Sequence, residues 1–288
     1  MSKTKILVCC HKHCEIPEDP IYLPIQVGKA LHDYDLGIQT DNQADGKACD
    51  NISDLNNVFS EMTAVYWAWK NMEKISPETE YIGLCHYRRF FYCKGSLKDS
   101  FLRRKTARAL CTAKFFKRHW TYSMYQEVNF MSSLRDEKLL ISDAKLDRIV
   151  PAYDIVTTLP VELVGYNVRT HFRLEHVFPD LLDEIVQDTY PGYFPQYQEI
   201  MEGHRFSCAN MFVMKKGIYQ QYCSFMFDIL FRHIQLMKDR GILEDPYNEK
   251  AFERGSGYLA EILTYVFIKK MEADGMKVAY TDKMFLEC

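Results

Sequence analysis

The sequence has few glycines, 13 in all, and they form none of the glycine-rich motifs that bind phosphate. Neither GxxxxGK[ST] nor a GxGxxG after the first predicted strand occurs, which argues against a P-loop protein and against a dinucleotide-binding unit. The GxSxG motif of α/β hydrolases and the HExxH motif of zinc proteases are also missing. Any phosphate that this protein binds must therefore be held by side chains or by a metal ion.

Long apolar runs are missing as well. No segment approaches the roughly 18 to 20 apolar residues of a transmembrane helix, and KILVCC near the start is too short for the core of a signal peptide. The 10 cysteines lie mostly singly within apolar segments, so we expect reduced thiols in a cytoplasmic protein. The net charge of -3 argues against nucleic acid as a partner through bulk electrostatics.

A cluster of soft metal ligands stands at residues 9–14, with the sequence CCHKHC. Cys10, His11, His13 and Cys14 suit zinc by residue type, but neighbouring positions on a strand point to opposite faces. No second ligand pair with zinc spacing follows. A first strand that ends in a polar loop therefore explains the cluster better than a zinc site does.

Apolar strand-like segments alternate with amphipathic helical ones along most of the chain. A helix is predicted from about Glu61, with Ser60 as its N-cap, and Pro77 follows its end. Predicted strands lie at 5–10, 36–40, 81–86, 152–160, 204–216 and 278–282, and further helices at 170–190, 217–240 and 255–275. This alternation predicts one α/β domain over residues 1–288, with a mostly parallel sheet flanked by helices.

A basic segment at residues 94–119 breaks this pattern. It carries nine Lys and Arg residues against one acid, with phenylalanines interleaved. We predict a mostly helical basic insertion over residues 94–149 whose first part binds an anionic membrane surface. A solvated helical face explains the same charges equally well. RNA binding is the weaker interpretation, because no RNA-binding module is recognisable.

The stretch YIGLCHYRRF, residues 81–90, brings two guanidinium groups and an imidazole to the end of a buried strand. The carboxyl edge of the sheet is where α/β proteins bind ligands, and arginine grips phosphate with a planar fork. We predict that His86, Arg88 and Arg89 bind a diphosphate. Alternation along a strand would place His86 and Arg88 on one side and Arg89 on the other. For a single arginine, a salt bridge with a core carboxylate would be the simpler explanation, but two arginines and a histidine at one strand end favour a ligand site.

Several segments together resemble a family of bacterial capsular and exopolysaccharide glycosyltransferases, long catalogued as a domain of unknown function in polysaccharide gene clusters. The segments are DNISDLNNVFSEMTAVYWAWKN, YIGLCHYRRFF, SCANMFVMKK with the following QYCSFMFDIL, and GYLAEIL. The resemblance spans nearly the whole chain, and IGLCHYRR and YWAWKN are its specific parts. It implies a GT-A-like fold and transfer of a sugar from a nucleotide donor, with UDP-galactose in pyranose or furanose form among the expected donors.

The resemblance also bears on metal dependence. In GT-A enzymes the corresponding strand usually ends in Asp-x-Asp, which holds a divalent metal on the donor diphosphate, whereas here it ends in HYRR. Cationic side chains can stabilise the departing UDP directly, so we expect a metal-independent enzyme with no cofactor besides its UDP-sugar substrate. Asp33-Tyr34-Asp35 is literally an Asp-x-Asp, but it follows a single strand and comes too early in the chain.

Contacts to the nucleotide and the sugar are assigned more loosely. His11 follows the first strand, where a GT-A enzyme contacts the base, and Asn210 lies at a strand that often contacts sugar or acceptor. Helix capping explains the polar loop before the first long helix equally well. Glu61 has an alternative role as well, because a carboxylate is stabilised near the positive N-terminal end of a helix. The predicted nucleotide- and sugar-binding residues are His11, Asp50, Asn51, Ser53, Asn56, Glu61 and Asn210.

An inverting transfer, which the resemblance implies, needs a group that takes the proton of the acceptor hydroxyl. Glu261 in GYLAEIL is the first candidate, and His176 and Asp180 follow, with His171 as a further histidine in the same segment. The family pattern has an arginine after this glutamate. Ile262 stands there in this chain, so any role of that arginine is absent or filled from elsewhere.

These expectations combine into a cytoplasmic glycosyltransferase, peripheral to the inner face of the plasma membrane, that extends a lipid-linked oligosaccharide acceptor. Two alternatives remain open at this point. One is a non-catalytic partner in a polysaccharide assembly complex, and the other is a metal-dependent nucleotide-sugar transferase or hydrolase. Intact His86, Arg88, Arg89 and Glu261 argue against the non-catalytic partner.

Overall fold

The computed structural model describes residues 3–92, 129–131, 152–163 and 165–286. The basic segment 94–119 lies outside these residues, and so does most of the insertion 94–149, so their helical structure stays a prediction. The described piece of that insertion, Asn129–Met131, is a strand, β8. The single-domain organisation likewise stays a prediction.

A nine-stranded sheet carries the fold, with the path β12-β9-β13-β7-β6-β1-β2-β3 and with β8 beside β13. Two small two-stranded sheets, β10-β11 and β4-β5, accompany it. The strands are β1 Thr4–Cys10, β2 Tyr22–Gln26, β3 Gln39–Thr40, β4 Gln43–Ala44, β5 Lys47–Ala48, β6 Tyr81–His86, β7 Arg89–Tyr92, β9 Ile155–Thr158, β10 Val161–Glu162, β11 Arg205–Phe206, β12 Phe212–Lys215 and β13 Val278–Leu286.

The large sheet is mixed, whereas the sequence predicts a mostly parallel one. The first strands, β3, β2, β1 and β6, are parallel to one another. Antiparallel pairs join β6 to β7 and β12, β12 to β9, and β13 to β7. The β6–β7 pair is antiparallel because a two-residue turn joins its strands, whereas the other antiparallel pairs join strands that are far apart in sequence.

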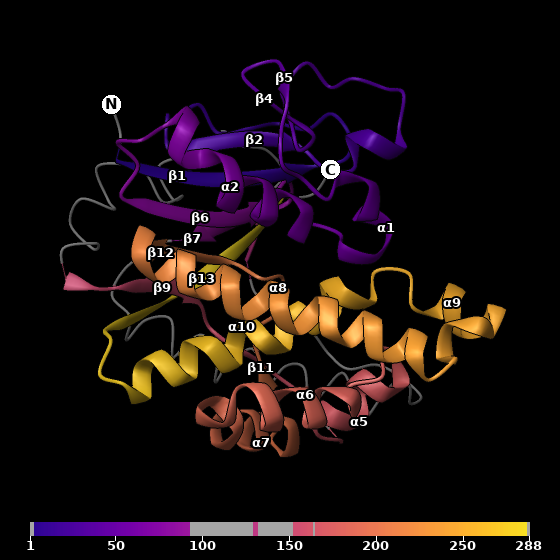
Figure 1. Ribbon diagram of the computed structural model, residues 1–288. Helices are drawn as coiled ribbons and strands as arrows, with labels where there is room; N and C mark the ends of the chain where they lie inside the picture. The colour runs from indigo at the N-terminus through magenta and orange to yellow at the C-terminus, as the bar shows by residue number, and fades with distance from the viewer. Residues whose placement is uncertain (1–2, 93–128, 132–151, 164, 287–288) are drawn as a thin grey trace.

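Helices form two layers on one side of the sheet, and the outer layer packs on the inner one. Figure 1 shows β1, β2 and β6 in the upper half, α8 and α10 side by side across the middle, and α5 to α7 at the bottom. The α-helices are α1 Asn56–Phe59, α2 Met62–Ile75, α5 Val168–Leu174, α6 Leu181–Thr189, α7 Phe194–Glu202, α8 Lys216–Asp239, α9 Pro246–Ala251 and α10 Gly255–Ala273, and the 3-10 turns are η1 Lys29–Leu31, η2 Ser53–Leu55, η5 Pro191–Tyr193 and η6 Ile242–Glu244.

The strand β2 is the element that the sequence conceals, because its sequence YLPIQ contains a proline and follows a loop rich in proline and acid. Pro24 pairs with Val8 of β1 on one side. On the other side β3 reaches only Ile25 and Gln26. The amide hydrogen that proline lacks is therefore not needed on that edge, and a proline is tolerated near the margin of a sheet.

A kink between α1 and α2 shapes the region at the carboxyl edge of β1 and β6. Ser60 adopts a positive φ of 50° there, and the Asn56 side chain donates a hydrogen bond to the Ser60 carbonyl at 2.7 Å. Gly257 of α10 packs against this kink, since a Cβ at Gly257 would lie 3.0 Å from the Ser60 Cβ. The close approach brings the beginnings of α2 and α10 together.

Candidate active site

Two adjoining cavities open at the carboxyl edge of β1 and β6, beside the beginnings of α2 and α10. Their volumes are about 530 and 470 Å³, within the range of pockets that bind small molecules. Both are lined by Glu61, His86, Arg88, Arg89 and Arg254. We call the first, which also reaches Glu261, the acid cavity, and the second, which reaches His11, the ring cavity.

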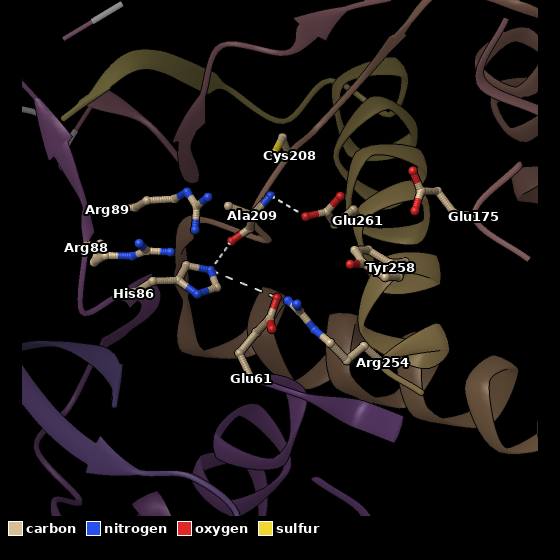
Figure 2. A pocket seen from close by; sticks show the side chains of 10 residues that line it. All are labelled: Glu61, His86, Arg88, Arg89, Glu175, Cys208, Ala209, Arg254, Tyr258 and Glu261. Carbon is tan, nitrogen blue, oxygen red and sulfur yellow. Dashed lines mark hydrogen bonds and ion pairs between the residues drawn. The ribbon is translucent and has the colours of Figure 1, made fainter. Parts of the chain in front are cut away.

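The turn between β6 and β7 delivers the cationic side chains. Its register pairs His86 with Arg89 across a turn made of Tyr87 and Arg88. The alternation predicted from the sequence, with Arg89 facing away from His86 and Arg88, is wrong, because the chain reverses after His86 instead of continuing as a strand. Arg88 and Arg89 both line the acid cavity, and Figure 2 shows them entering from the same side as His86.

A third guanidinium comes from Arg254, directly before α10. Arg254 has a positive φ of 66°, a left-handed conformation that costs a residue with a side chain about 1–2 kcal/mol. Its backbone N–H donates to the Asn57 carbonyl at 2.6 Å, which ties it to α1. Strained backbone of this kind is concentrated at functional sites. Arg254 lines both cavities, so three arginines from two distant parts of the chain surround one space.

His86 lies between the arginines of the site and the carboxylate of Glu61. Its Nε2 lies 2.5 Å from the Ala209 carbonyl oxygen, which can only accept, so Nε2 carries the hydrogen. The same atom lies 3.9 Å from Oε1 of Glu61. Burial lowers the pKa of His86, the Glu61 carboxylate raises it, and nearby Arg89 lowers it, with a net shift downward. His86 is therefore a neutral hydrogen-bond donor at neutral pH.

Glu261 is the carboxylate that faces the arginines across the acid cavity. Its Oε1 accepts a hydrogen bond from the Ala209 N–H at 2.7 Å. Burial raises the pKa of Glu261 to about 7, the Ala209 hydrogen bond opposes this rise, and the Glu61 charge adds to it. A carboxylate that titrates near neutral pH suits a general base, and Figure 2 shows it on α10 opposite Arg88 and Arg89.

The loop before β12 connects these groups through its backbone. Ala209 and Asn210 both have positive φ, 74° and 50°. The Ala209 carbonyl faces His86 and its N–H faces Glu261. The buried Asn210 side chain donates to Glu61 Oε1 at 2.9 Å and to the Gly257 carbonyl, and it accepts from the Thr264 hydroxyl. Asn210, predicted as a sugar contact, lines neither cavity and instead positions Glu61.

The ring cavity is lined by three of the residues predicted to contact the nucleotide or the sugar, His11, Asn56 and Glu61. His11 follows β1, and its ring meets the Tyr87 ring edge to face with centroids 4.8 Å apart. Burial and the neighbouring Lys12, Arg88 and Arg254 lower the pKa of His11. Both rings and Asn56 line this cavity.

Three of the predicted nucleotide contacts, Asp50, Asn51 and Ser53, line neither cavity. Asp50 accepts from the Tyr66 hydroxyl, and Asn51 accepts from the Ser53 N–H. The Ser53 hydroxyl donates to the buried Asp41 carboxylate. These side chains thus form hydrogen bonds within the protein, but none of them caps a helix, since η2, α1 and α2 have no side-chain hydrogen bond at their N-caps.

Asp41 is a buried acid that the sequence does not single out. Its carboxylate accepts from the N–H groups of Gly28 and Lys29 and from the hydroxyls of Ser53 and Thr63. Asp41 therefore ties the beginning of η1 to η2 and to the first turn of α2.

The other candidate bases do not join the site. Asp180 forms ion pairs with Arg169 and Arg173, and Arg173 holds the pKa of this carboxyl low. His176 is exposed and contacts the Tyr247 ring. His171 is buried against aromatic rings, and burial lowers its pKa to about 4. None of these three residues lines the acid cavity or the ring cavity.

Metal-ligating clusters and membrane-spanning helices are both absent from the described residues. No group of three or more His, Cys, Asp or Glu side chains in the described part of the chain is arranged to hold a metal ion. Asp33 and Asp35 line neither cavity, and Asp35 accepts from the Gly37 N–H. Over the same part of the chain, no helix combines the length and hydropathy needed to cross a membrane.

Sequence reasoning missed several residues of the site, namely Arg254, Glu175, Tyr258, Cys208 and Ala209. The glycines of GSGY mark the beginning of α10, and a charged residue directly before them is the signal that points to Arg254. Glu175 is the neighbour of His176, and no sequence signal marks it, because it reaches the cavity only through the position at which α5 ends.

Comparisons with known proteins give one family and one fold. A comparison with curated proteins finds no match. The solved structure titled "WbbM bifunctional glycosytransferase apo structure" superposes with a TM-score of 0.75 at 24% sequence identity, over 99% of this chain and 45% of that one. This likeness shows a shared fold, and the chain spans less than half of that protein. The family model described as "Domain of unknown function (DUF4422)" matches residues 5–272, and the chain therefore belongs to this family.

Proposed function

We propose that this protein is a glycosyltransferase that moves a sugar from a nucleoside-diphosphate donor to a hydroxyl group of an acceptor. The observation that carries the proposal is the placement of three arginines opposite Glu261, whose pKa is raised to about 7, across one cavity. The fold shared with a glycosyltransferase supports it. The GT-A-like arrangement that the resemblance implies is part of the same proposal.

Each group has a part in a single displacement. Glu261 takes the proton of the acceptor hydroxyl, whose oxygen then attacks the anomeric carbon of the donor sugar. The bond from that carbon to the diphosphate breaks, and its electron pair goes to the diphosphate oxygen. Arg88, Arg89 and Arg254 stabilise this developing negative charge. One displacement inverts the anomeric carbon, and cationic side chains in this role make a metal-independent reaction the version we propose.

The two cavities suggest how the donor lies. The shared arginines suit the diphosphate, the rings of His11 and Tyr87 suit the base, and the acid cavity with Glu261 suits the sugar and the acceptor hydroxyl. We propose a UDP-sugar, with galactose in pyranose or furanose form, and a lipid-linked oligosaccharide acceptor. Attachment of the basic segment 94–119 to the inner face of the plasma membrane belongs to this proposal and rests on sequence alone.

Calorimetric titration with UDP tests the binding half of the proposal. A charge-assisted hydrogen bond is worth about 1.5–3 kcal/mol, so Arg88→Ala and Arg89→Ala should each weaken UDP binding by about 10-fold to 100-fold. Arg232→Ala is the matched control, because it removes a guanidinium that pairs with Asp228 on α8 and lines neither cavity. Equal UDP affinity in all four proteins would contradict the proposed diphosphate site.

A further inference from the structure

Two cysteines of the CCHKHC stretch lie within contact distance of each other beside the ring cavity. The Sγ atoms of Cys10 and Cys14 are 3.5 Å apart. Cys10 is the last residue of β1 and is buried, while Cys14 lies in the loop that follows and is partly exposed. A disulfide needs the same two atoms about 2.05 Å apart, so a small loop movement suffices to close one.

We propose that Cys10 and Cys14 form a reversible disulfide, a modification site that closes the His11 loop against the end of β1. The course of the chain favours this disulfide, because only residues 11–13 separate Cys10, at the fixed end of a strand, from Cys14, in a partly exposed loop position. Cys10 is held in the sheet by pairing of β1 with Gln26 of β2.

The two thiols have different parts in the oxidation. The hydrogen bond between the two thiols, and then Lys12, lower the pKa of Cys14, and the same hydrogen bond together with burial raises the pKa of Cys10. The Cys14 thiolate therefore attacks a low-molecular-weight disulfide, such as oxidised glutathione, and releases one thiol. Cys10 then attacks the Cys14 sulfur of the mixed disulfide, gives up its proton, and releases the second thiol. Two protein thiols are oxidised and one external disulfide is reduced.

Closure of this bond would change the ring cavity. The sulfur atoms must approach each other by about 1.5 Å, the difference between the observed 3.5 Å and a disulfide bond. Since Cys10 is fixed in the sheet, the movement falls on the loop. The loop carries His11, which lines the cavity and whose carbonyl accepts from the Tyr34 hydroxyl at 2.9 Å. The loop also carries Lys12, whose Nζ lies 5.4 Å from the Tyr87 ring centroid.

Trypsin mapping of the oxidised chain tests the site without any activity assay. Cleavage after Lys5, Lys12 and Lys29 places Cys10 in peptide 6–12 and Cys14 in peptide 13–29. After equilibration with oxidised glutathione, we expect these two peptides to be linked, and the link to disappear with dithiothreitol. The protein is kept folded during oxidation, and remaining thiols are alkylated before digestion.

Three substitutions make the assignment specific. Cys9→Ser should keep the link, since the Cys9 thiol is directed to the Glu61 carbonyl instead, and Cys10→Ser and Cys14→Ser should each abolish it. A link that survives Cys10→Ser, a link from peptide 13–29 to the Cys85 peptide 75–88, or no link at all would overturn the proposal.

The consequence for the cavity is measured by UDP affinity and rests on the proposed function. Loss of one ordinary contact weakens binding by about fivefold, so the oxidised wild type should bind UDP at least that much more weakly than the reduced one. Cys14→Ser, oxidised in the same way, keeps every other thiol and should show no change. A linked protein with unchanged affinity would overturn the effect on the cavity, whereas reduced protein that never binds UDP would contradict the proposed function alone.

Discussion

Replacing Glu261 with glutamine tests the proposed general base with little disturbance of the structure. The amide oxygen of glutamine can still accept the Ala209 N–H, which lies 2.7 Å from Oε1 in the wild type. Loss of a general base typically lowers the rate by about 10²–10⁴-fold. Because the pKa of Glu261 is about 7, the wild-type rate should rise with pH through neutrality, and the residual rate of Glu261→Gln should not follow that rise.

The same substitution changes how stability depends on pH. The pKa of Glu261 is about 7 in the folded protein against an ordinary 4.5, so between these pH values the folded state keeps a proton that the unfolded state releases. Stability therefore falls as pH rises through this window. At 1.36 kcal/mol per pH unit the loss is at most about 3 kcal/mol. Glu261→Gln lacks this loss, so its advantage over wild type should grow by up to about 3 kcal/mol from acid to alkaline pH.

Urea denaturation near pH 5 and pH 8, together with pH–rate profiles, measures both effects. Glu175→Gln is the control, because it removes a carboxylate from the same cavity without touching Ala209, and it should lower the rate much less than Glu261→Gln. Equal pH–rate profiles for wild type and Glu261→Gln, or a stability difference that does not grow with pH, would refute the assignment of Glu261.

Three further variants test Arg254, Asn210 and the basic segment 94–119. Arg254→Gly should weaken UDP binding yet leave thermal stability equal or raise it by about 1 kcal/mol, since glycine adopts the φ of 66° without strain. Asn210→Gly, which keeps the positive φ but loses three side-chain hydrogen bonds, should cost about 1–3 kcal/mol in urea denaturation and lower the rate. Full activity and stability in Asn210→Gly would show that the side chain is dispensable. Replacing the lysines and arginines of 94–119 with glutamine should reduce binding to anionic liposomes and spare activity on a short soluble acceptor; unchanged liposome binding would rule out the membrane interpretation.

Patterns within one element predicted much of the fold. The apolar run KILVCC predicts a strand that the structure confirms as β1, and the three- and four-residue spacing of apolar residues after Ser60 predicts α2. Trp67 of α2 is fully buried, and its Nε1 donates to the Gln43 carbonyl. The mixed character of the sheet was not predictable in this way, because strand direction is set by connections and long-range pairing rather than by local pattern.

In the candidate site too, the residues marked by a local sequence pattern could be predicted, and those placed by long-range contacts could not. His86, Arg88 and Arg89 stand out as polar residues at the end of an apolar strand, and Glu261 stands out as a carboxylate within an apolar helix. The structure brings all four to one cavity. Arg254 is far from the other arginines in sequence, and its backbone conformation leaves no local pattern. Likewise, the carboxamide of Asn210 suits a ligand as well as it suits Glu61, so only three-dimensional packing distinguishes the two roles.

The most direct test of the central claim is release of UDP from a panel of UDP-sugars, with and without EDTA and with an oligosaccharide acceptor, for wild type and Arg88→Ala. We predict that one donor turns over faster with acceptor, that turnover survives EDTA, and that Arg88→Ala loses it. Abolition by EDTA would contradict the cationic diphosphate site and put a metal in the reaction. Release that no acceptor accelerates would indicate a hydrolase, and no release from any donor would contradict a UDP-sugar transferase.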